Sequence, residues 1–270
     1  MYHLLRQHPD VFMSPVKEPF YFAQDLDFPR GWVMVKEQGQ YLNLFSGARG
    51  EARSGEASPF YLYSDHAAQE IKRRCPDPRV IIMLRNPPDM MYSLYCLWRF
   101  SGLDPSPTFE VALDNESPGI PLVRRYRALA HYPDHVTRYL THLGRSHVHV
   151  VVFDDLVANP ENTYRDVCAF LDIDSTFRPA LSLSDRQRGA SRAPRLRWVP
   201  RALSAYGARW GRPRRWWPGL HGAILRVNAI EPAPMAGTVR TRILREFAAD
   251  SQRLAGLTGR SFTRWLDGGL

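Results

Sequence analysis

Two short apolar runs dominate the hydrophobic pattern of the 270-residue chain. Arg79–Leu84 (RVIIML) and His147–Phe153 (HVHVVVF) are rich in β-branched residues, and each is only a few residues long. Such runs are typical of strands buried on both faces of a parallel sheet. A helical pattern follows each run, at Asp89–Phe100 and at Pro160–Leu171, and Ile120–Gly144 is helical between them. The alternation predicts an α/β domain with a parallel sheet flanked by helices.

Shorter patterns fill the rest of the chain. Pro15 and Pro19 forbid a regular helix over Asp10–Phe22, so this stretch is expected to be extended. Helices are predicted for Tyr2–His8, Gln40–Ala48, Ser64–Arg74 and Thr238–Leu257, with a loop at Arg49–Gly55. We find no linker that divides the chain, and therefore expect a single domain over residues 1–270.

The end of the first apolar run carries the first candidate site. In open α/β sheets ligands collect at the carboxyl ends of the strands, where Arg85 and Asp154 fall. Arg85 begins the sequence RNPPDMMYS, which ends at Ser93 on the next helix. A guanidinium and a hydroxyl near a helix N-terminus suit a phosphate dianion. The alternative is that Arg85 lies at the surface and pairs with Asp89. For Asp154 two interpretations also stay open: it contacts substrate, or it caps the next turn.

The second candidate is the carboxylate in the sequence KEPFYF, which begins at Lys17. The flanking proline and aromatic residues are expected to desolvate Glu18 partly, which favours its protonated form and brings it towards the range of a general base. The alternative is an exposed Lys17–Glu18 pair on a loop. The turn-like sequence GEASPFY carries chemistry only if Glu56 and Ser58 face the same cleft.

The net charge of +9 is concentrated in one segment. Residues 186–217 contain ten Arg and no Asp, Glu or Lys, so this segment contributes +10 and the rest of the chain −1. We therefore expect no nucleic-acid partner. The segment also contains four Trp, and three interpretations stay open: a lid that attracts an anionic ligand, a contact with an anionic membrane surface, or a solvated loop.

Composition excludes several classes of protein. The 44% of hydrophobic residues excludes overall disorder, and three Cys in 270 residues exclude a disulfide scaffold. No apolar run reaches the ~18 residues of a membrane span, and the first residues lack the apolar core of a signal peptide, so the expected location is the cytoplasm, with peripheral membrane contact through 186–217. His131 and His135 have a spacing that could ligate zinc, but no HExxH pattern completes it, and we expect no metal.

Five motifs in order resemble the sulfotransferase family, in particular the bacterial branch similar to heparan sulfate sulfotransferase domains. They are HPDVFMSPVKEPFYF, GEASPFYL, VIIMLRNPPDMMYSLY, VHVVVFDDLVANPENTYRDVCAFLDI and ILREFAADSQRLAGLTGRSFTRWL. The resemblance implies a P-loop-kinase-like fold and a sulfuryl donor, 3′-phosphoadenosine 5′-phosphosulfate (PAPS). It implies that Arg85 and Ser93 hold the 3′-phosphate of the donor, and that Glu18 is the general base on a hydroxyl or amine of a carbohydrate or lipid acceptor.

Two departures from the family pattern stand out. Related enzymes use a Lys at the position of Ala57, and Lys17 or an Arg of 186–217 is the expected substitute. The sequence also contains no phosphate loop of the form GxxxxGK[ST] or KxGT. We therefore expect the first strand and phosphate loop, roughly 15–20 residues, to be missing, and favour an internal start over a degenerate copy. The alternative function is a truncated, non-catalytic relative that binds a nucleotide or a membrane.

Overall fold

A computed structural model describes the chain except for residues 30–31, 33, 181–192, 195, 197–226 and 267–270. Most of the Arg-rich segment 186–217 therefore lies outside the described residues. The described strands are β1 (Val11–Met13), β2 (Arg53–Gly55), β3 (Val80–Leu84), β4 (Val148–Val152), β5 (Ala193–Pro194) and β6 (Ala229–Ile230).

Helices surround these strands. The described α-helices are α1 (Tyr2–Leu5), α2 (Gln38–Asn43), α3 (Ala67–Arg74), α4 (Pro87–Phe100), α5 (Phe109–Asp114), α6 (Tyr126–Ala130), α7 (Tyr132–Leu143), α8 (Phe153–Ala158), α9 (Pro160–Leu171), α13 (Gly237–Glu246), α14 (Ala248–Thr258) and α15 (Thr263–Leu266). Single 3₁₀ turns occur at Pro59–Tyr63, Leu122–Arg124 and Arg145–His147. The predicted α/β class is confirmed.

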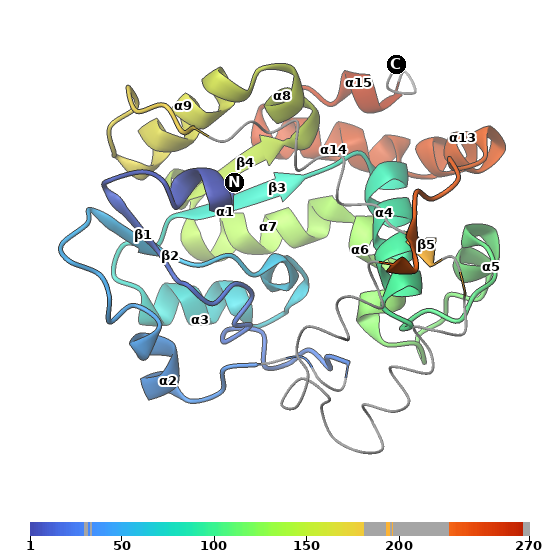
Figure 1. Ribbon diagram of the computed structural model, residues 1–270. Coiled ribbons are helices and arrows are strands. Elements are labelled where there is room, and N and C mark those ends of the chain that lie inside the picture. Colours follow the sequence, from blue (N-terminus) through green and yellow to red (C-terminus); the bar gives the residue numbers. More distant parts are fainter. Residues whose placement is uncertain (30–31, 33, 181–192, 195, 197–226, 267–270) are drawn as a thin grey trace.

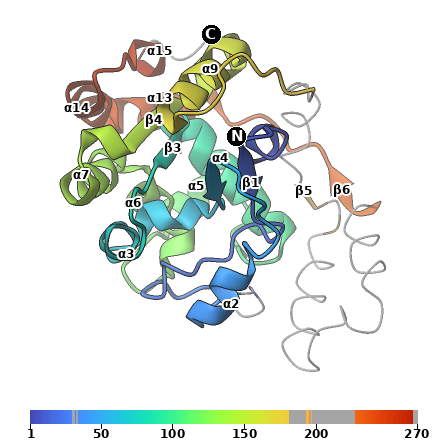
Figure 2. The same cartoon turned by 90° about the vertical axis from the view of Figure 1, so that its left-hand side faces the viewer.

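Parallel pairing organises the centre of the molecule. β3 pairs with β4 from Val80–Val148 through Leu84–Val152, and β1 pairs with β2 in the same parallel sense. The predicted parallel sheet is thus built as two separate pairs, and no described strand joins β2 to β3. β5 and β6 form a short antiparallel pair beside α4, on the side of the body opposite α3 and α7 (Figure 2).

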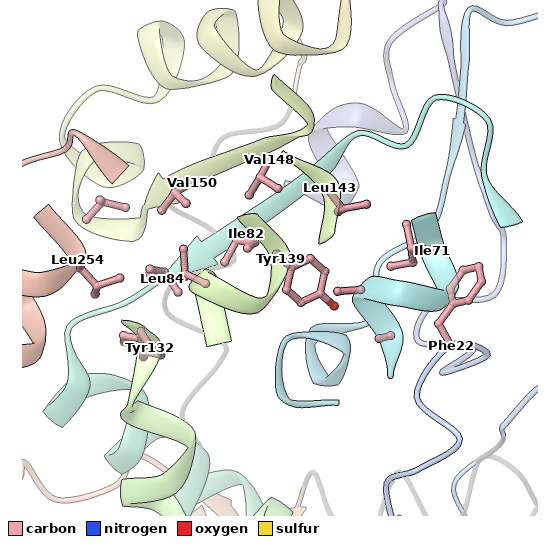
Figure 3. Close-up of a cluster of buried hydrophobic side chains, with 14 of the residues drawn as sticks. Phe22, Ile71, Ile82, Leu84, Tyr132, Tyr139, Leu143, Val148, Val150 and Leu254 are labelled. Atoms are coloured by element: carbon pink, nitrogen blue, oxygen red, sulfur yellow. The ribbon is translucent and has the colours of Figure 1, made fainter. Parts of the chain in front are cut away.

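The β3–β4 pair lies between two layers of helices, α8 and α9 on one side and α7 on the other (Figure 1). Side chains of β4 alternate between these layers because successive residues of a strand point to opposite faces. Val148 and Val150 pack with α3, α7 and α14, whereas Val151 packs with α1 and α9. Figure 3 shows the first of these clusters, where Ile82 lies beside Tyr139 of α7 and Leu84 lies towards Leu254 of α14. Burial on both faces explains the nearly continuous apolar run of β4, whereas β3 is buried mainly on the face that carries Ile82 and Leu84.

A further cluster of buried residues covers the carboxyl end of β3. It is built around α4 with contributions from α5, α6 and α13, and Trp98 is its largest residue on α4. The ring of Phe20 also belongs to it, so the N-terminal segment that carries Glu18 is packed against α4. This cluster fixes the position of α4, and with it the strand-to-helix junction at Arg85.

Several predicted elements differ from the observed ones. The helical stretch expected over Ile120–Gly144 is divided into a 3₁₀ turn, α6 and α7. The helix expected over Thr238–Leu257 is divided into α13 and α14 at Phe247, whose φ and ψ angles of −99° and 12° interrupt the helix. Phe247 is nearly completely buried in the cluster around α4, so tertiary packing outweighs helical continuity there. The loop expected over Arg49–Gly55 contains β2, which pairs with β1 over only three residues.

None of the helices in the described parts of the chain is long and apolar enough to span a membrane.

Neighbouring residues of β3 offer a test of this layer arrangement. Ile82 is buried between β4 and α7, whereas Met83 is 36% exposed on the same strand. Ile82→Ala is expected to lower the free energy of unfolding by about 2–5 kcal/mol, because it leaves a cavity, and Met83→Ala by less than about 1 kcal/mol. Urea denaturation measures both, and equal losses would contradict the assignment of faces.

Candidate functional site

Arg85 lies directly after β3, and Phe153 lies directly after β4. Because the two strands are parallel neighbours, their carboxyl ends meet, and the Arg85 guanidinium lies 5.2 Å from the centre of the Phe153 ring. The Arg85 carbonyl accepts a hydrogen bond of 3.0 Å from the Tyr132 hydroxyl of α7. Among the described residues the guanidinium has no carboxylate partner. It is therefore a half-buried cation, held by an aromatic face, whose hydrogen-bond donors are free for an anion.

The carboxylate that could have neutralised Arg85 is occupied elsewhere. Asp89, in the first turn of α4, accepts two hydrogen bonds from Arg240 of α13, at 2.6 and 3.0 Å. The alternative of an Arg85–Asp89 surface pair is therefore wrong. The fork-shaped pairing with Arg240 also neutralises a negative charge that would otherwise oppose an anion at this helix N-terminus.

The N-terminus of α4 offers few backbone donors. Its first two residues are Pro87 and Pro88, which have no N–H, and Asn86 precedes them as N-cap. An anion at this place must therefore be held mainly by side chains. Ser93 lies seven residues beyond Asn86, about two turns or ~10 Å along the helix. It is partly exposed, and no hydrogen bond of the described structure involves its hydroxyl.

Asp154 has a structural partner. Its Oδ2 accepts a hydrogen bond of 2.7 Å from the indole N–H of Trp265, on α15. The residue lies in the first turn of α8, where a carboxylate is also favoured by the helix dipole. Asp154 thus ties the C-terminal helix to the end of β4, and this contact accounts for it without a substrate.

Glu18 lies on a strained turn. Glu18 and Phe20 both have left-handed φ angles, of 60° and 53°, on either side of Pro19. The backbone N–H of Glu18 donates to the carbonyl of Ala57 at 3.0 Å, and that of Phe20 donates to Ser58 Oγ at 3.3 Å. The GEASP sequence therefore supports the Glu18 turn with its backbone and with its serine.

The Glu18 side chain is one-third exposed and lies 3.1 Å from Lys17 Nζ through its Oε1. The exposed Lys–Glu pair expected as the alternative is thus present, and the aromatic neighbours of Glu18 point into the core instead of covering it. An exposed pair of this kind is worth little to stability, so the Lys17 ammonium can move to another anion at small cost. Ala57, where related enzymes have Lys, offers its carbonyl to the turn.

The desolvated carboxylate of this region is Glu56. Burial raises the pKa of Glu56 from 4.5 to about 7, although hydrogen bonding from Tyr61 and Ser58 lowers it in part; the nearby charge of Glu18 raises it further. Ser58 Oγ donates to Glu56 Oε2 at 2.8 Å, while Oε1 is buried without a hydrogen-bond partner in the described structure. The desolvated carboxylate expected at Glu18 is thus found at Glu56. In the sequence, the indication that Glu56 matters is that Ser58 lies two residues away. This proximity becomes informative only when the folded structure shows that residues 18–20 pack on the segment 56–58.

The structure thus contains two separate groups of candidate residues. Arg85 and Ser93 belong to the junction of β3 and α4, and Glu18 belongs to the turn that packs on residues 56–58. Among the described residues no hydrogen bond or ion pair joins Glu18 to Arg85 or Ser93. The two groups share the cluster of buried residues around α4, through the ring of Phe20.

The candidate histidines do not converge. His131 pairs with Asp250 at 2.7 Å, and His135 Nε2 contacts the Ala128 carbonyl at 3.0 Å. In the described part of the chain no group of three His, Cys, Asp or Glu residues could hold a metal ion.

A cation at the carboxyl end of parallel strands, together with a carboxylate on a separate turn, is an arrangement typical of α/β enzymes that act on anionic ligands. The sequence pattern of the sulfotransferase family matches residues 37–177, about half of the chain. The chain therefore belongs to the sulfotransferase family and is a transferase. Arg85, Ser93 and Glu56 lie inside the matched region, and Glu18 precedes it.

Comparison of structures agrees with this assignment. The fold is similar to the crystal structure of a sulfotransferase from Alicyclobacillus acidocaldarius, with a TM-score of 0.73 and 27% sequence identity over 97% of this chain and 91% of that one. A search of curated proteins by sequence finds no match.

The pKa of Glu56 predicts a pH-dependent stability. Because the pKa is raised in the folded state, folding is favoured by the bound proton below pH 4.5, and this contribution is lost as the pH rises through about 7. Relative to Glu56→Gln, the wild type should lose about 3 kcal/mol of unfolding free energy between about pH 4 and pH 8. Urea denaturation of both proteins measures this difference; a constant difference over that range would contradict the burial of a titrating carboxyl.

Proposed function

We propose that this chain transfers the sulfuryl group of PAPS to a hydroxyl or amine of a carbohydrate or lipid acceptor. The observation that carries the proposal is the Arg85 guanidinium, which lies at the carboxyl end of β3 while Asp89 is held by Arg240. The family assignment and the order of the five motifs support the donor. The resemblance to heparan sulfate sulfotransferase domains supports the acceptor class.

The residues at the β3–α4 junction fit the 3′-phosphate of the donor. Arg85 supplies two charged N–H donors on one face, and Ser93 supplies a hydroxyl farther along α4. Pro87 and Pro88 remove backbone donors, so the two side chains have to supply most of the hydrogen bonds. The donor, when bound, supplies an electrophilic sulfur whose leaving group is a phosphate of the nucleotide.

The Glu18 turn supplies the acid–base chemistry. In the proposed reaction the carboxylate of Glu18 accepts the proton of the acceptor hydroxyl or amine as the new bond to sulfur forms. Lys17, 3.1 Å from Glu18, provides a cation beside the base that can stabilise negative charge on the transferred group. Transfer of this kind needs positioning, a cation and one base, which these residues provide.

Arg85→Ala is expected to weaken the binding of adenosine 3′,5′-bisphosphate by roughly 1.5–3 kcal/mol, the value of lost charge-assisted hydrogen bonds. Arg242→Ala, which removes an exposed arginine of α13, serves as the control and should leave the affinity unchanged. Isothermal titration calorimetry measures both. Equal affinities of the wild type and Arg85→Ala would refute the assignment of Arg85.

Glu18→Gln is expected to reduce turnover by about 10²–10⁴-fold, the usual contribution of a general base, with nucleotide binding unchanged. Glu37→Gln, in an exposed position before α2, is the matched control. Transfer of radiolabelled sulfate from PAPS to a panel of glycans and glycolipids measures both variants. Unaltered turnover would refute the base assignment. A chain that binds the bisphosphate but transfers nothing would instead be the non-catalytic relative.

For the segment 186–217 we propose contact with an anionic membrane surface, supported by its ten Arg and four Trp. Replacing Arg209, Arg212, Arg214 and Arg215 by Gln is expected to reduce co-sedimentation with anionic liposomes, since each basic residue near such a surface contributes about 1 kcal/mol. Unchanged co-sedimentation would count against the membrane contact. A loss of PAPS affinity instead would favour the lid.

A further inference from the structure

The turn that carries Glu18 cannot hold its shape by local preference alone. Glu18 and Phe20 both adopt left-handed φ angles, which cost a residue other than glycine roughly 1–2 kcal/mol each. Pro19 between them restricts the chain still further, because its own φ is fixed. Contacts from outside the turn must therefore maintain this conformation.

Part of the support comes from aromatic packing. The Phe20 ring stacks on Phe28 and on Trp32, with centroid distances of 4.5 and 5.4 Å, and meets Phe60 edge-on. Its position in the cluster around α4 anchors one end of the turn. The carbonyl of Pro19 accepts a hydrogen bond of 2.9 Å from the Val35 N–H. These contacts fix the backbone on one side of the turn only.

The other side is held by hydrogen bonds that end on a carboxylate. The Phe20 N–H donates to Ser58 Oγ at 3.3 Å, and the same hydroxyl donates to Glu56 Oε2 at 2.8 Å. A serine hydroxyl has a single proton and rotates to suit its partners. As long as Glu56 is an acceptor only, the proton of Ser58 points towards Glu56, and a lone pair of Ser58 is left facing the Phe20 N–H.

We propose that Glu56 is a positioning residue for Glu18, which acts by fixing the orientation of the Ser58 hydroxyl and thereby the turn 18–20. The inference rests on the proposed role of Glu18 as a base. It adds a residue that does not touch the substrate but decides how rigidly the base is held.

The surroundings of Glu56 make this orientation dependent on pH. The titratable groups that interact with Glu56 are Glu18 on the turn, Tyr41 of α2, Tyr61 of the 3₁₀ turn, Cys75 after α3 and Tyr139 of α7. Of these groups, Glu18 is the one that raises the pKa of Glu56 by its charge. A protonated Glu56 can donate as well as accept, so it no longer dictates the direction of the Ser58 hydroxyl. The turn should therefore loosen as the pH falls through about 7.

Hydrogen exchange of the Phe20 and Glu18 amides tests the proposal without any need for turnover. At pH 8 the Phe20 amide of the wild type should be protected roughly threefold to tenfold more than at pH 6, after correction for intrinsic exchange, the range expected for one hydrogen bond. Glu56→Gln, which keeps the shape and cannot ionise, should show the low protection at both pH values. Glu51→Gln, which removes a carboxyl that lies before β2 and accepts a hydrogen bond from the Arg49 N–H, is the control and should behave as the wild type.

Kinetics on PAPS-dependent transfer provide the second readout. Glu56→Gln is expected to lower kcat at pH 8 without changing the KM for PAPS, and to remove the fall of kcat between pH 8 and pH 6. If the Phe20 amide is equally protected in wild type and Glu56→Gln at pH 8, the positioning role is refuted, whether or not transfer occurs. If exchange follows the prediction and no transfer is found with any acceptor, the proposed function fails and the structural coupling stands.

Discussion

The contact between the turn 18–20 and the segment 56–58 decides where the Glu18 carboxylate lies in this fold. Glu18 lies at the surface beside Lys17, on a backbone conformation that only outside contacts can maintain. One of those contacts, the hydrogen bond from the Phe20 N–H to Ser58, leads to Glu56, a carboxylate whose ionisation is opposed by burial and which therefore costs stability at neutral pH. A dependence of the Glu18 turn on Glu56 would explain this cost, because functional sites often lower the stability of the fold locally.

The position of Arg85 depends on a different kind of arrangement. The parallel pairing of β3 with β4 brings Arg85 over the ring of Phe153. The ion pair between Asp89 and Arg240 keeps the Asp89 carboxylate from pairing with Arg85. Arg240 lies on α13, far along the chain from α4, so the C-terminal helices control the charge at the N-terminus of α4. The cluster of buried residues around α4 joins this junction to the Glu18 turn, since Phe20 and Met91 both belong to it.

Sequence reasoning located the parts of the fold whose signal is local. The strands β3 and β4 and the helix Pro160–Leu171 were predicted to within a residue, because their apolar runs and capping residues lie within the elements themselves. β2 was missed because three residues that pair with a distant strand leave no pattern, and Phe247 interrupts a helix only because it is buried elsewhere. The pairing of Asp89 with Arg240 and the burial of Glu56 also could not be predicted from the sequence. Each depends on residues brought together from distant segments, 151 positions apart for Arg240 and Asp89.

The proposed sulfuryl transfer requires a single ligand site that reaches from the β3–α4 junction to the Glu18 turn. A crystal structure of the chain with adenosine 3′,5′-bisphosphate tests it most directly. The account predicts the 3′-phosphate within hydrogen-bond distance of the Arg85 guanidinium and the Ser93 hydroxyl, with the 5′-phosphate directed towards Glu18 and Lys17. A nucleotide bound elsewhere, or bound with Arg85 turned away from its phosphates, would contradict it.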